Sequence, residues 1–144
     1  MRHLALALAL ATAIAFAPTG HAQTASDALY RQFGGQPGLV KLVDDFMVRL
    51  LADPRTGPHF KLADQQRVKE QLVDQFCVIM GGPCAYKGAD MKSIHSNMDI
   101  TKGDFNALVE ALQRAMDAQG IAFGAQNQLL AKLAPMHRAV ITVQ

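Results

Sequence analysis

The sequence predicts an all-α fold, and three features support this prediction. Apolar residues recur every three or four positions in several segments, which is the spacing of one helix face. No segment keeps the alternation of polar and apolar residues that is typical of a half-buried strand. Glycine and proline interrupt the helical pattern at Gly57-Pro58, Gly81-Gly82-Pro83 and Gly120. Periodicity by itself therefore indicates a small helical bundle.

The first 22 residues have the pattern of a secretory signal peptide. Arg2 gives a positive start, Leu4 to Ala17 is an apolar run, and small residues precede a cleavage site after Ala22. The run is short for a membrane span, so an uncleaved anchor is the weaker alternative. Cleavage would leave residues 23–144, enough for one domain with one core and no membrane segment. We expect that domain in the periplasm or outside the cell.

The charge of the mature chain argues against nucleic acid as a partner. Without Arg2, 13 basic and 12 acidic residues remain, a net charge of +1, and the two signs are dispersed. Nucleic-acid binding needs cations that neutralise several phosphates together. The near-neutral net charge and the dispersed signs argue in the same way against any other strongly anionic partner.

Two helices are expected in the first half of the domain. The first has Pro37 at its opening position and ends before Pro54, because the residue before a proline is disfavoured in a helix. The second runs from about Asp64 to Met80 and ends at Gly81-Gly82-Pro83. Their apolar faces carry Leu39, Leu42, Val43, Phe46, Met47 and Leu50, and then Val68, Leu72, Phe76 and Ile79.

In the second half of the domain, the sequence predicts a short helical turn followed by two long helices. The turn spans Asp90 to Met98, with Met91, Ile94, His95 and Met98 facing inward. Thr101 and Asp104 have the spacing of a capping box at the start of a helix that ends at Gly120. The last helix is expected from Gln126 to Val143. The two apolar faces carry Phe105, Leu108, Val109, Leu112 and Met116, and then Leu129, Leu130, Leu133, Met136, His137 and Val140.

Several short motifs occur together along these segments. They are Tyr30, Phe33-Gly34-Gly35, Asp45-Phe46, Arg49-Leu50, Phe60, Gly81-Gly82-Pro83, Tyr86-Lys87-Gly88 and Met91-Lys92-x-x-His95. In this combination the chain resembles the group I truncated haemoglobins, from about Ser26 to Thr142. The resemblance implies a two-over-two helical sandwich around haem b (iron protoporphyrin IX).

His95 is the candidate iron ligand. An isolated histidine on an apolar face is ordinarily a satisfied core residue, but the surrounding motif favours a ligand to haem iron. Iron binds a neutral imidazole nitrogen, so the other ring nitrogen must donate its proton, and a carbonyl near Met91 is the expected acceptor. Phe60 matches the family's phenylalanine on the porphyrin face. Lys92, close to His95 at a helix edge, is placed to meet a haem propionate.

The resemblance puts Met47, Val68 and Leu72 on the ligand side of the haem. The family usually has a tyrosine at the first of these positions and commonly a glutamine at one of the others. Both types donate a hydrogen bond to bound dioxygen, whereas these three residues cannot. Gln71 is the nearby polar side chain that could turn inward. For Met47, ordinary core packing is favoured over a thioether bond to iron.

Two further histidines remain in the mature chain. His137 follows Ala134-Pro135-Met136 and resembles a histidine that some cyanobacterial members link covalently to a haem vinyl group. A half-buried histidine at the haem edge is favoured over such a cross-link. His59 is expected at the surface.

Cys77 and Cys84 are the only cysteines. The chain has no Cys-x-x-Cys-His, which excludes c-type haem attachment. An exported protein meets an oxidising compartment, and the glycine break between the two cysteines allows them to approach within bridging distance. A disulfide is favoured over two free thiols.

Reversible binding of diatomic gases (O2, CO and NO) is the leading function. An apolar ligand side should favour CO and NO over dioxygen. The alternatives are a haem enzyme (nitric oxide dioxygenase or peroxidase), a six-coordinate electron-transfer protein with an unknown redox partner, and a helical interaction module without cofactor. The missing tyrosine weighs against the dioxygenase, and the lack of a histidine or arginine on the ligand side weighs against the peroxidase.

Overall fold

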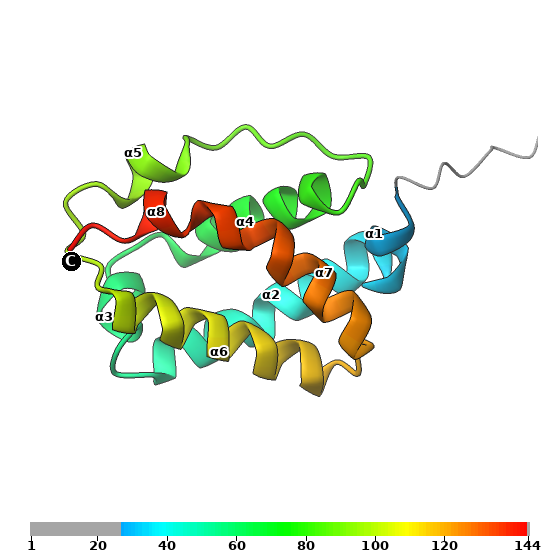
Figure 1. Cartoon of the computed structure of the whole chain (residues 1–144), viewed down its shortest axis with the longest axis horizontal. Coiled ribbons are helices and arrows are strands. Elements are labelled where there is room, and N and C mark those ends of the chain that lie inside the picture. Colours follow the sequence, from blue (N-terminus) through cyan, green and yellow to red (C-terminus); the bar gives the residue numbers. More distant parts are fainter. Residues whose placement is uncertain (1–26, 144) are drawn as a thin grey trace, which may run out of the picture.

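Helices form all the regular secondary structure in residues 27–143, the part of the chain that the computed structural model describes (Figure 1). In chain order they are α1 (Ala28–Gln32), α2 (Gly35–Ala52), α3 (Gly57–Phe60), α4 (Gln65–Ile79), α5 (Met91–His95), α6 (Lys102–Ala118), α7 (Phe123–Leu133), the 3-10 turn η2 (Ala134–Met136) and α8 (His137–Val140). The expected signal peptide, residues 1–22, lies outside the described residues. Within the described part, none of the helices has the length and apolarity that a membrane span requires.

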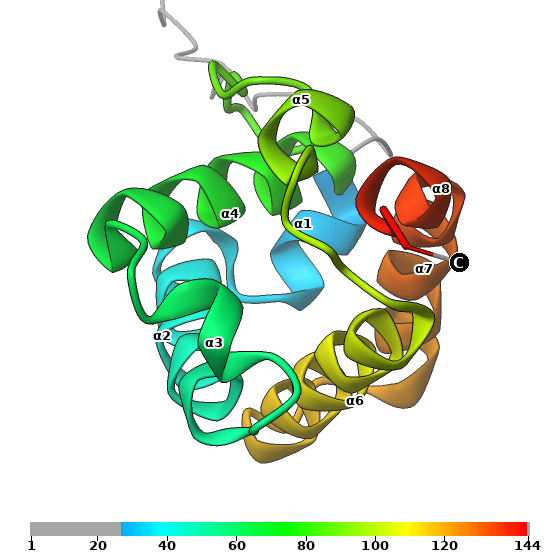
Figure 2. The same cartoon turned by 90° about the vertical axis from the view of Figure 1, so that its left-hand side faces the viewer.

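Two helix pairs make up the body of the protein. α2 packs against α4 and also against α6, while α7 runs on through η2 into α8. Figure 2 shows α2 and α4 on one side and α6 and α7 on the other, with α5 between the ends of α4 and α8. This is the two-over-two sandwich that the resemblance implied, and it confirms the predicted fold class.

The core lies where α2 meets its two neighbours. Because α2 contacts both α4 and α6, its apolar face is buried along its whole length, and each such side chain stabilises the fold by about 1.5–3 kcal/mol. The buried residues of these helices are Leu39, Leu42, Val43, Phe46, Met47 and Leu50 from α2, Val73, Phe76 and Cys77 from α4, Ala107, Ala111, Leu112, Ala115 and Met116 from α6, and Ala125, Gln126 and Leu129 from α7.

Side-chain caps fix where α4 and α6 begin. The Asp64 side chain accepts a hydrogen bond from the Arg67 amide at 3.1 Å, which starts α4. Thr101 and Asp104 form the predicted capping box at the start of α6, each side chain accepting from the other residue's backbone amide. Each cap satisfies an amide that the helix itself leaves unpaired.

The predicted last helix is wrong in its bounds. α7 starts at Phe123, earlier than expected, and stops at Leu133, after which the chain forms η2 and then α8. Pro135 is the cause, since proline has no amide hydrogen and its ring clashes with the preceding helical turn. The break turns the residues that follow it, and His137 becomes exposed instead of continuing the apolar face.

The inward faces predicted for α5 and α6 need a second correction. Ile94 is 43 % exposed, while Met91 and His95 are half-buried, because only one side of the short α5 rests against α8. The buried face of α6 carries Ala107, Ala111, Leu112, Ala115 and Met116, so Leu112 and Met116 are buried as predicted. Phe105, Leu108 and Val109, which were predicted on the same face, lie beside it and are only half-buried.

Candidate functional site

The helix that carries His95 is short and is held by Asp90, the residue that caps its N-terminus. The Asp90 carboxylate accepts hydrogen bonds from the Ser93 amide, at 3.0 Å, and from the Ser93 hydroxyl. These bonds hold the pKa of Asp90 below its ordinary value of 3.8. A five-residue helix has little stability of its own, so this cap contributes directly to the position of His95.

The His95 ring is oriented by a backbone carbonyl. Its Nδ1 lies 2.7 Å from the carbonyl oxygen of Met91, one turn earlier, as the sequence predicted. A carbonyl only accepts, so Nδ1 carries the proton and Nε2 keeps its lone pair. The half-buried ring therefore presents one free, neutral nitrogen, which is the form of histidine that binds a metal.

A disulfide joins the end of α4 to the segment that leads to α5. Cys77 and Cys84 are bonded, with Cα atoms 5.9 Å apart, which confirms the favoured interpretation. Gly82 lies within this loop, and a Cβ there would come within 2.5 Å of Cys77 Sγ and 2.8 Å of the Tyr30 ring. Only glycine lets the chain pass this closely over the disulfide.

Gln75 connects α4 to α5 and η2, a role that was not predicted from the sequence. Its Nε2 lies 3.3 Å from the Met91 sulfur and 3.8 Å from the Met136 sulfur. The signal was present in the helical spacing, because Gln75 follows Val68 by seven positions and Leu72 by three, on the same face of α4.

Several apolar side chains pack against the core without being buried. These half-buried residues come from four helices and are Phe60, Leu72, Ile79, Leu108, Leu130 and Leu133. Val68 and Met91 have the same intermediate exposure. Incompletely covered apolar surface contributed by helices of both pairs suits a flat, largely apolar ligand lying between them.

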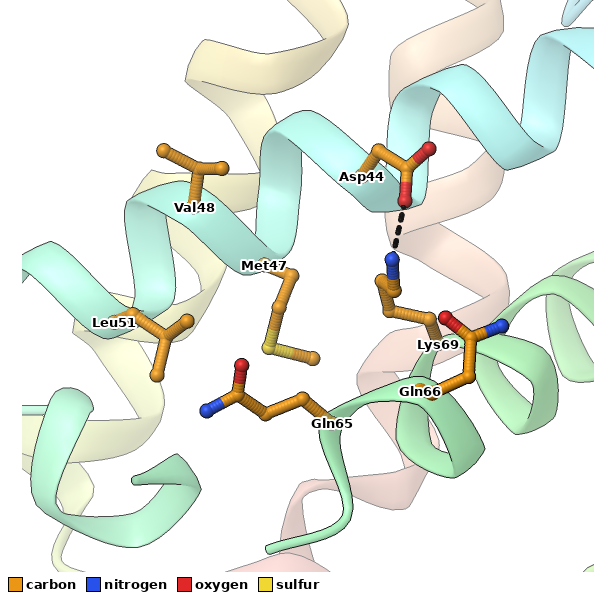
Figure 3. A pocket seen from close by; sticks show the side chains of 7 residues that line it. All are labelled: Asp44, Met47, Val48, Leu51, Gln65, Gln66 and Lys69. Carbon is orange, nitrogen blue, oxygen red and sulfur yellow. Dashed lines mark hydrogen bonds and ion pairs between the residues drawn. The ribbon is translucent and has the colours of Figure 1, made fainter. Parts of the chain in front are cut away.

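Met47 is 3 % exposed and belongs to a groove between α2 and α4. The groove has a volume of about 410 Å³ and is lined by Asp44, Met47, Val48, Leu51, Gln65, Gln66 and Lys69. Figure 3 shows the Met47 side chain pointing toward Gln65, and the Asp44–Lys69 ion pair, 2.8 Å long, spans the two helices. Burial in this position agrees with core packing of Met47.

Gln71 does not turn toward Met47. A Cβ at Gly88 would come within 2.2 Å of Gln71 Oε1 and 2.3 Å of the Tyr86 hydroxyl, so the Gln71 amide lies against the segment that precedes α5. The Tyr86 hydroxyl donates to the Ala89 carbonyl, and burial, followed by the nearby Asp90 charge, raises the pKa of Tyr86. The sequence suggested that Gln71 could turn toward the ligand side of the haem. In the structure it lies on the α5 side of the site instead.

The remaining candidates, Lys92 and His137, lie at the edges of the site, and His59 lies outside it. Lys92 is exposed on α5. His137 is exposed, its ring centroid lies 6.4 Å from that of Phe105, and its Nδ1 is 3.0 Å from the Ala134 carbonyl. His59 was expected at the surface, but its side chain is 21 % exposed and its Nε2 lies 3.7 Å from the Asp104 carboxylate.

The side chains that could bind a metal here suit only one kind of metal-containing cofactor. Among residues 27–143, no three or more His, Cys, Asp or Glu side chains gather in a way that could hold a metal ion. A single free imidazole instead matches an iron that brings four ring nitrogens with it, as haem does. The apolar surface between the helix pairs fits the same group.

Comparison with known proteins agrees with this geometry. The family model described as bacterial-like globin matches residues 28–142. A group 1 truncated haemoglobin from Mycolicibacterium paratuberculosis is 31 % identical over 80 % of this chain and 85 % of its own length. The Fe(III) crystal structure of truncated haemoglobin from Tetrahymena pyriformis has a TM-score of 0.75 and 26 % identity, over 78 % of this chain and 97 % of that one.

A more distant neighbour shows the same fold. The 2/2 haemoglobin from a Synechococcus species, solved with covalently attached haem, has a TM-score of 0.74 at 22 % identity, over 78 % of this chain and 97 % of that one. The family model alone covers residues 28–142 of the described 27–143. This chain therefore belongs to the bacterial-like globin family and, within it, to the group 1 truncated haemoglobins.

Proposed function

We propose that this protein is an exported truncated haemoglobin that holds haem b through His95 and binds diatomic gases reversibly. Its family supports a haem-binding globin. When bound, haem supplies an iron with a free coordination position for O2, CO or NO. The residues of this chain then decide how the iron is held and what surrounds the gas.

The observation that carries the proposal is the state of the His95 ring. The 2.7 Å contact between Nδ1 and the Met91 carbonyl selects the tautomer whose Nε2 can bind iron. It also fixes the direction of the ring on a helix that the Asp90 cap begins. Because Nδ1 keeps its hydrogen and donates it to the Met91 carbonyl, the lone pair of Nε2 is available to iron.

The apolar residues would exclude water from the haem faces. Phe60, Leu72 and Leu108 come from three helices, are half-buried, and would gain further burial against a porphyrin. Lys92, exposed on α5, would meet a propionate at the edge. Met47, Val68 and Leu72 offer no hydrogen-bond donor, which supports a preference for CO and NO over dioxygen.

Export is supported by two separate features. Residues 1–22 have a signal-peptide pattern. The Cys77–Cys84 disulfide would persist in the periplasm or outside the cell, whereas the cytosol keeps thiols reduced.

Removal of the His95 imidazole tests the proposal. His95→Gly should lose tight haem binding, and added imidazole should restore the ferrous spectrum, because the free ring can fill the space of the lost side chain. The control is His59→Gln, which changes a histidine outside the site and should keep one haem per chain. Circular dichroism of each variant checks that the helices remain. If His95→Gly keeps stoichiometric haem with an unchanged ferrous spectrum, His95 is not the ligand.

A further inference from the structure

The end of the chain is fastened to the segment that follows His95. Ile100, which is buried, donates its amide hydrogen to Thr142 Oγ1 at 2.8 Å. Its carbonyl accepts from the amides of Thr142, at 2.9 Å, and Val143, at 3.0 Å. Figure 1 shows the C-terminal end beside the stretch between α5 and α6. We call these three hydrogen bonds the C-terminal clasp.

We propose that Thr142 is a positioning residue for His95: the C-terminal clasp holds the segment after His95 in a conformation that it would not keep alone. This inference rests on the proposed role of His95 as iron ligand. The last residues of the chain would then influence the haem iron, although they lie far from His95 in the sequence.

The segment between His95 and the clasp has an unfavourable backbone. Asn97 and Asp99 have φ angles of 64° and 50°, in the left-handed region that residues with a Cβ disfavour. Asparagine and aspartate tolerate this region better than other non-glycine residues. Two such residues within three positions nevertheless persist only where the surroundings fix the chain at both ends.

Both ends of the segment are fixed in the structure. On one side, α5 begins at its Asp90 cap, and the Ser96 hydroxyl donates to the Ser93 carbonyl at 2.8 Å. On the other side, Ile100 is held by the clasp, and Thr101 then begins α6. Only residues 96–99 separate His95 from Ile100, so a shift of Ile100 reaches the histidine without a flexible linker to absorb it.

The same end of the chain also supports α5 from the side. α8 (His137–Val140) contacts α5, and Ile141 links it to Thr142 and Val143, which form the clasp with Ile100. Loosening the clasp would thus free the strained segment and the helix that braces α5 at once. The expected consequence is a His95 ring with a wider range of orientations, and so a weaker and less uniform bond to iron.

The test compares Thr142→Val with Thr142→Ser in the haem-loaded protein. Valine keeps the shape but removes the oxygen that accepts from Ile100, whereas serine keeps the oxygen. Resonance Raman spectra of the ferrous form give the iron–histidine stretching band, and transfer of haem to an excess of apomyoglobin gives the rate of haem loss. Thr142→Val should shift and broaden the band and speed haem loss roughly threefold to tenfold, the effect of one hydrogen bond. Thr142→Ser should match the wild type in both.

Gln119→Leu is the control for a merely structural effect. Gln119 Nε2 donates to the Gly38 carbonyl at 3.0 Å, at the opposite end of α6 from Ile100. This variant also loses one hydrogen bond between distant segments, and it should lower the unfolding midpoint without shifting the band. A chain that ends at Ile141 removes all three bonds of the clasp and should exceed the Thr142→Val effect.

The outcomes separate the two proposals. An unchanged band in both Thr142→Val and the shortened chain overturns the positioning role and leaves His95 as the ligand. A wild-type protein without an iron–histidine band overturns the role of His95, and the positioning role with it. A band shift in Gln119→Leu equal to that in Thr142→Val also overturns the positioning role, since any loss of stability would then have the same effect.

Discussion

On the α5 side of the proposed haem site, hydrogen bonds and a disulfide hold the chain, whereas on the α2–α4 side the candidate residues Met47 and Leu72 are held by apolar packing. On the α5 side, each contact joins specific atoms. The Asp90 side chain caps the Ser93 amide, the Met91 carbonyl accepts from His95 Nδ1, and a disulfide bonds Cys77 to Cys84. On the other side, Met47 is buried in α2, and Leu72 packs half-buried against the core. Directional bonds set the orientation of a ring, while apolar packing sets only the shape of a space.

This difference indicates a division of labour within the site. The side with polar contacts would orient one ligand to iron. The apolar side would leave the gas with little besides the iron itself to hold it, because none of Met47, Val68 and Leu72 donates a hydrogen bond. Gln71, the polar side chain once expected there, lies instead against Gly88 on the α5 side.

Loss of the disulfide should give the largest change in stability. The double change of Cys77→Ser with Cys84→Ser frees the loop before α5, and the chain-entropy estimate for so short a loop is about 2–3 kcal/mol. Urea unfolding of the haem-free protein measures this difference. Wild-type protein expressed with its N-terminal segment and recovered from the periplasm or the medium, to which we propose that it is exported, should show no reactive thiol when it is denatured without reductant. Two reactive thiols per chain would contradict the bridge.

A donor placed on the apolar side should slow the release of dioxygen. Met47→Tyr adds a hydroxyl, and a hydrogen bond to a partly charged ligand is worth about 1.5–3 kcal/mol, so the off-rate should fall roughly tenfold to hundredfold. Met47→Phe is the matched control, since it adds the ring without the hydroxyl. Stopped-flow displacement of dioxygen by CO gives both rates. Equal rates for the two variants would show that position 47 does not face the gas.

At acid pH the α5 side of the site should loosen, because α5 loses the side-chain cap that Asp90 provides. The pKa of Asp90 is lowered because Ser93 donates two hydrogen bonds to its carboxylate. The cap is therefore fully effective above the ordinary pKa of 3.8 and is lost as the pH falls below it through the lowered folded-state pKa. Haem retention should decline over this window in the wild type. Asp90→Asn keeps an acceptor that does not titrate, and it should flatten this part of the pH profile.

The smallest effect is expected at His137. Its exposed ring beside Phe105 favours ordinary contact at the haem edge over a covalent bond. Extraction with acidified butanone should consequently remove all haem from the wild type as readily as from His137→Ala. Haem that stays with the wild-type chain, and leaves the variant, would instead reveal the vinyl cross-link.

Features that depend only on residues close together in the sequence could be predicted from it. The ends of α2 and α4 follow from Pro54 and the Gly-Gly-Pro break, and the Thr101–Asp104 capping box occurs as predicted. The acceptor for the His95 ring also lies one turn away in the same helix. Even the break of the last helix was signalled locally, because a proline at position 135 ends a helical pattern.

Features that join distant segments could not be read in this way. The pairing of His59 with Asp104, the position of Gln71 against Gly88, and the three bonds between Ile100 and residues 142–143 each depend on how helices are placed relative to one another. Periodicity gives the face of a helix but not its partner. The exposed Ile94 shows the same limit, since helical spacing could not reveal that α5 rests against α8 on one side only.

The absorption spectrum of the ferrous protein, before and after CO is added, tests the division between the two sides most directly. We predict a five-coordinate, high-spin spectrum with His95 as the one protein ligand, which converts completely to the carbonyl form. This follows because His95 on the α5 side supplies an oriented nitrogen, whereas Met47, Val68 and Leu72 on the α2–α4 side supply only apolar contact. A six-coordinate, low-spin ferrous spectrum before CO is added would contradict it, since a side chain such as Met47 would then occupy the position proposed for the gas.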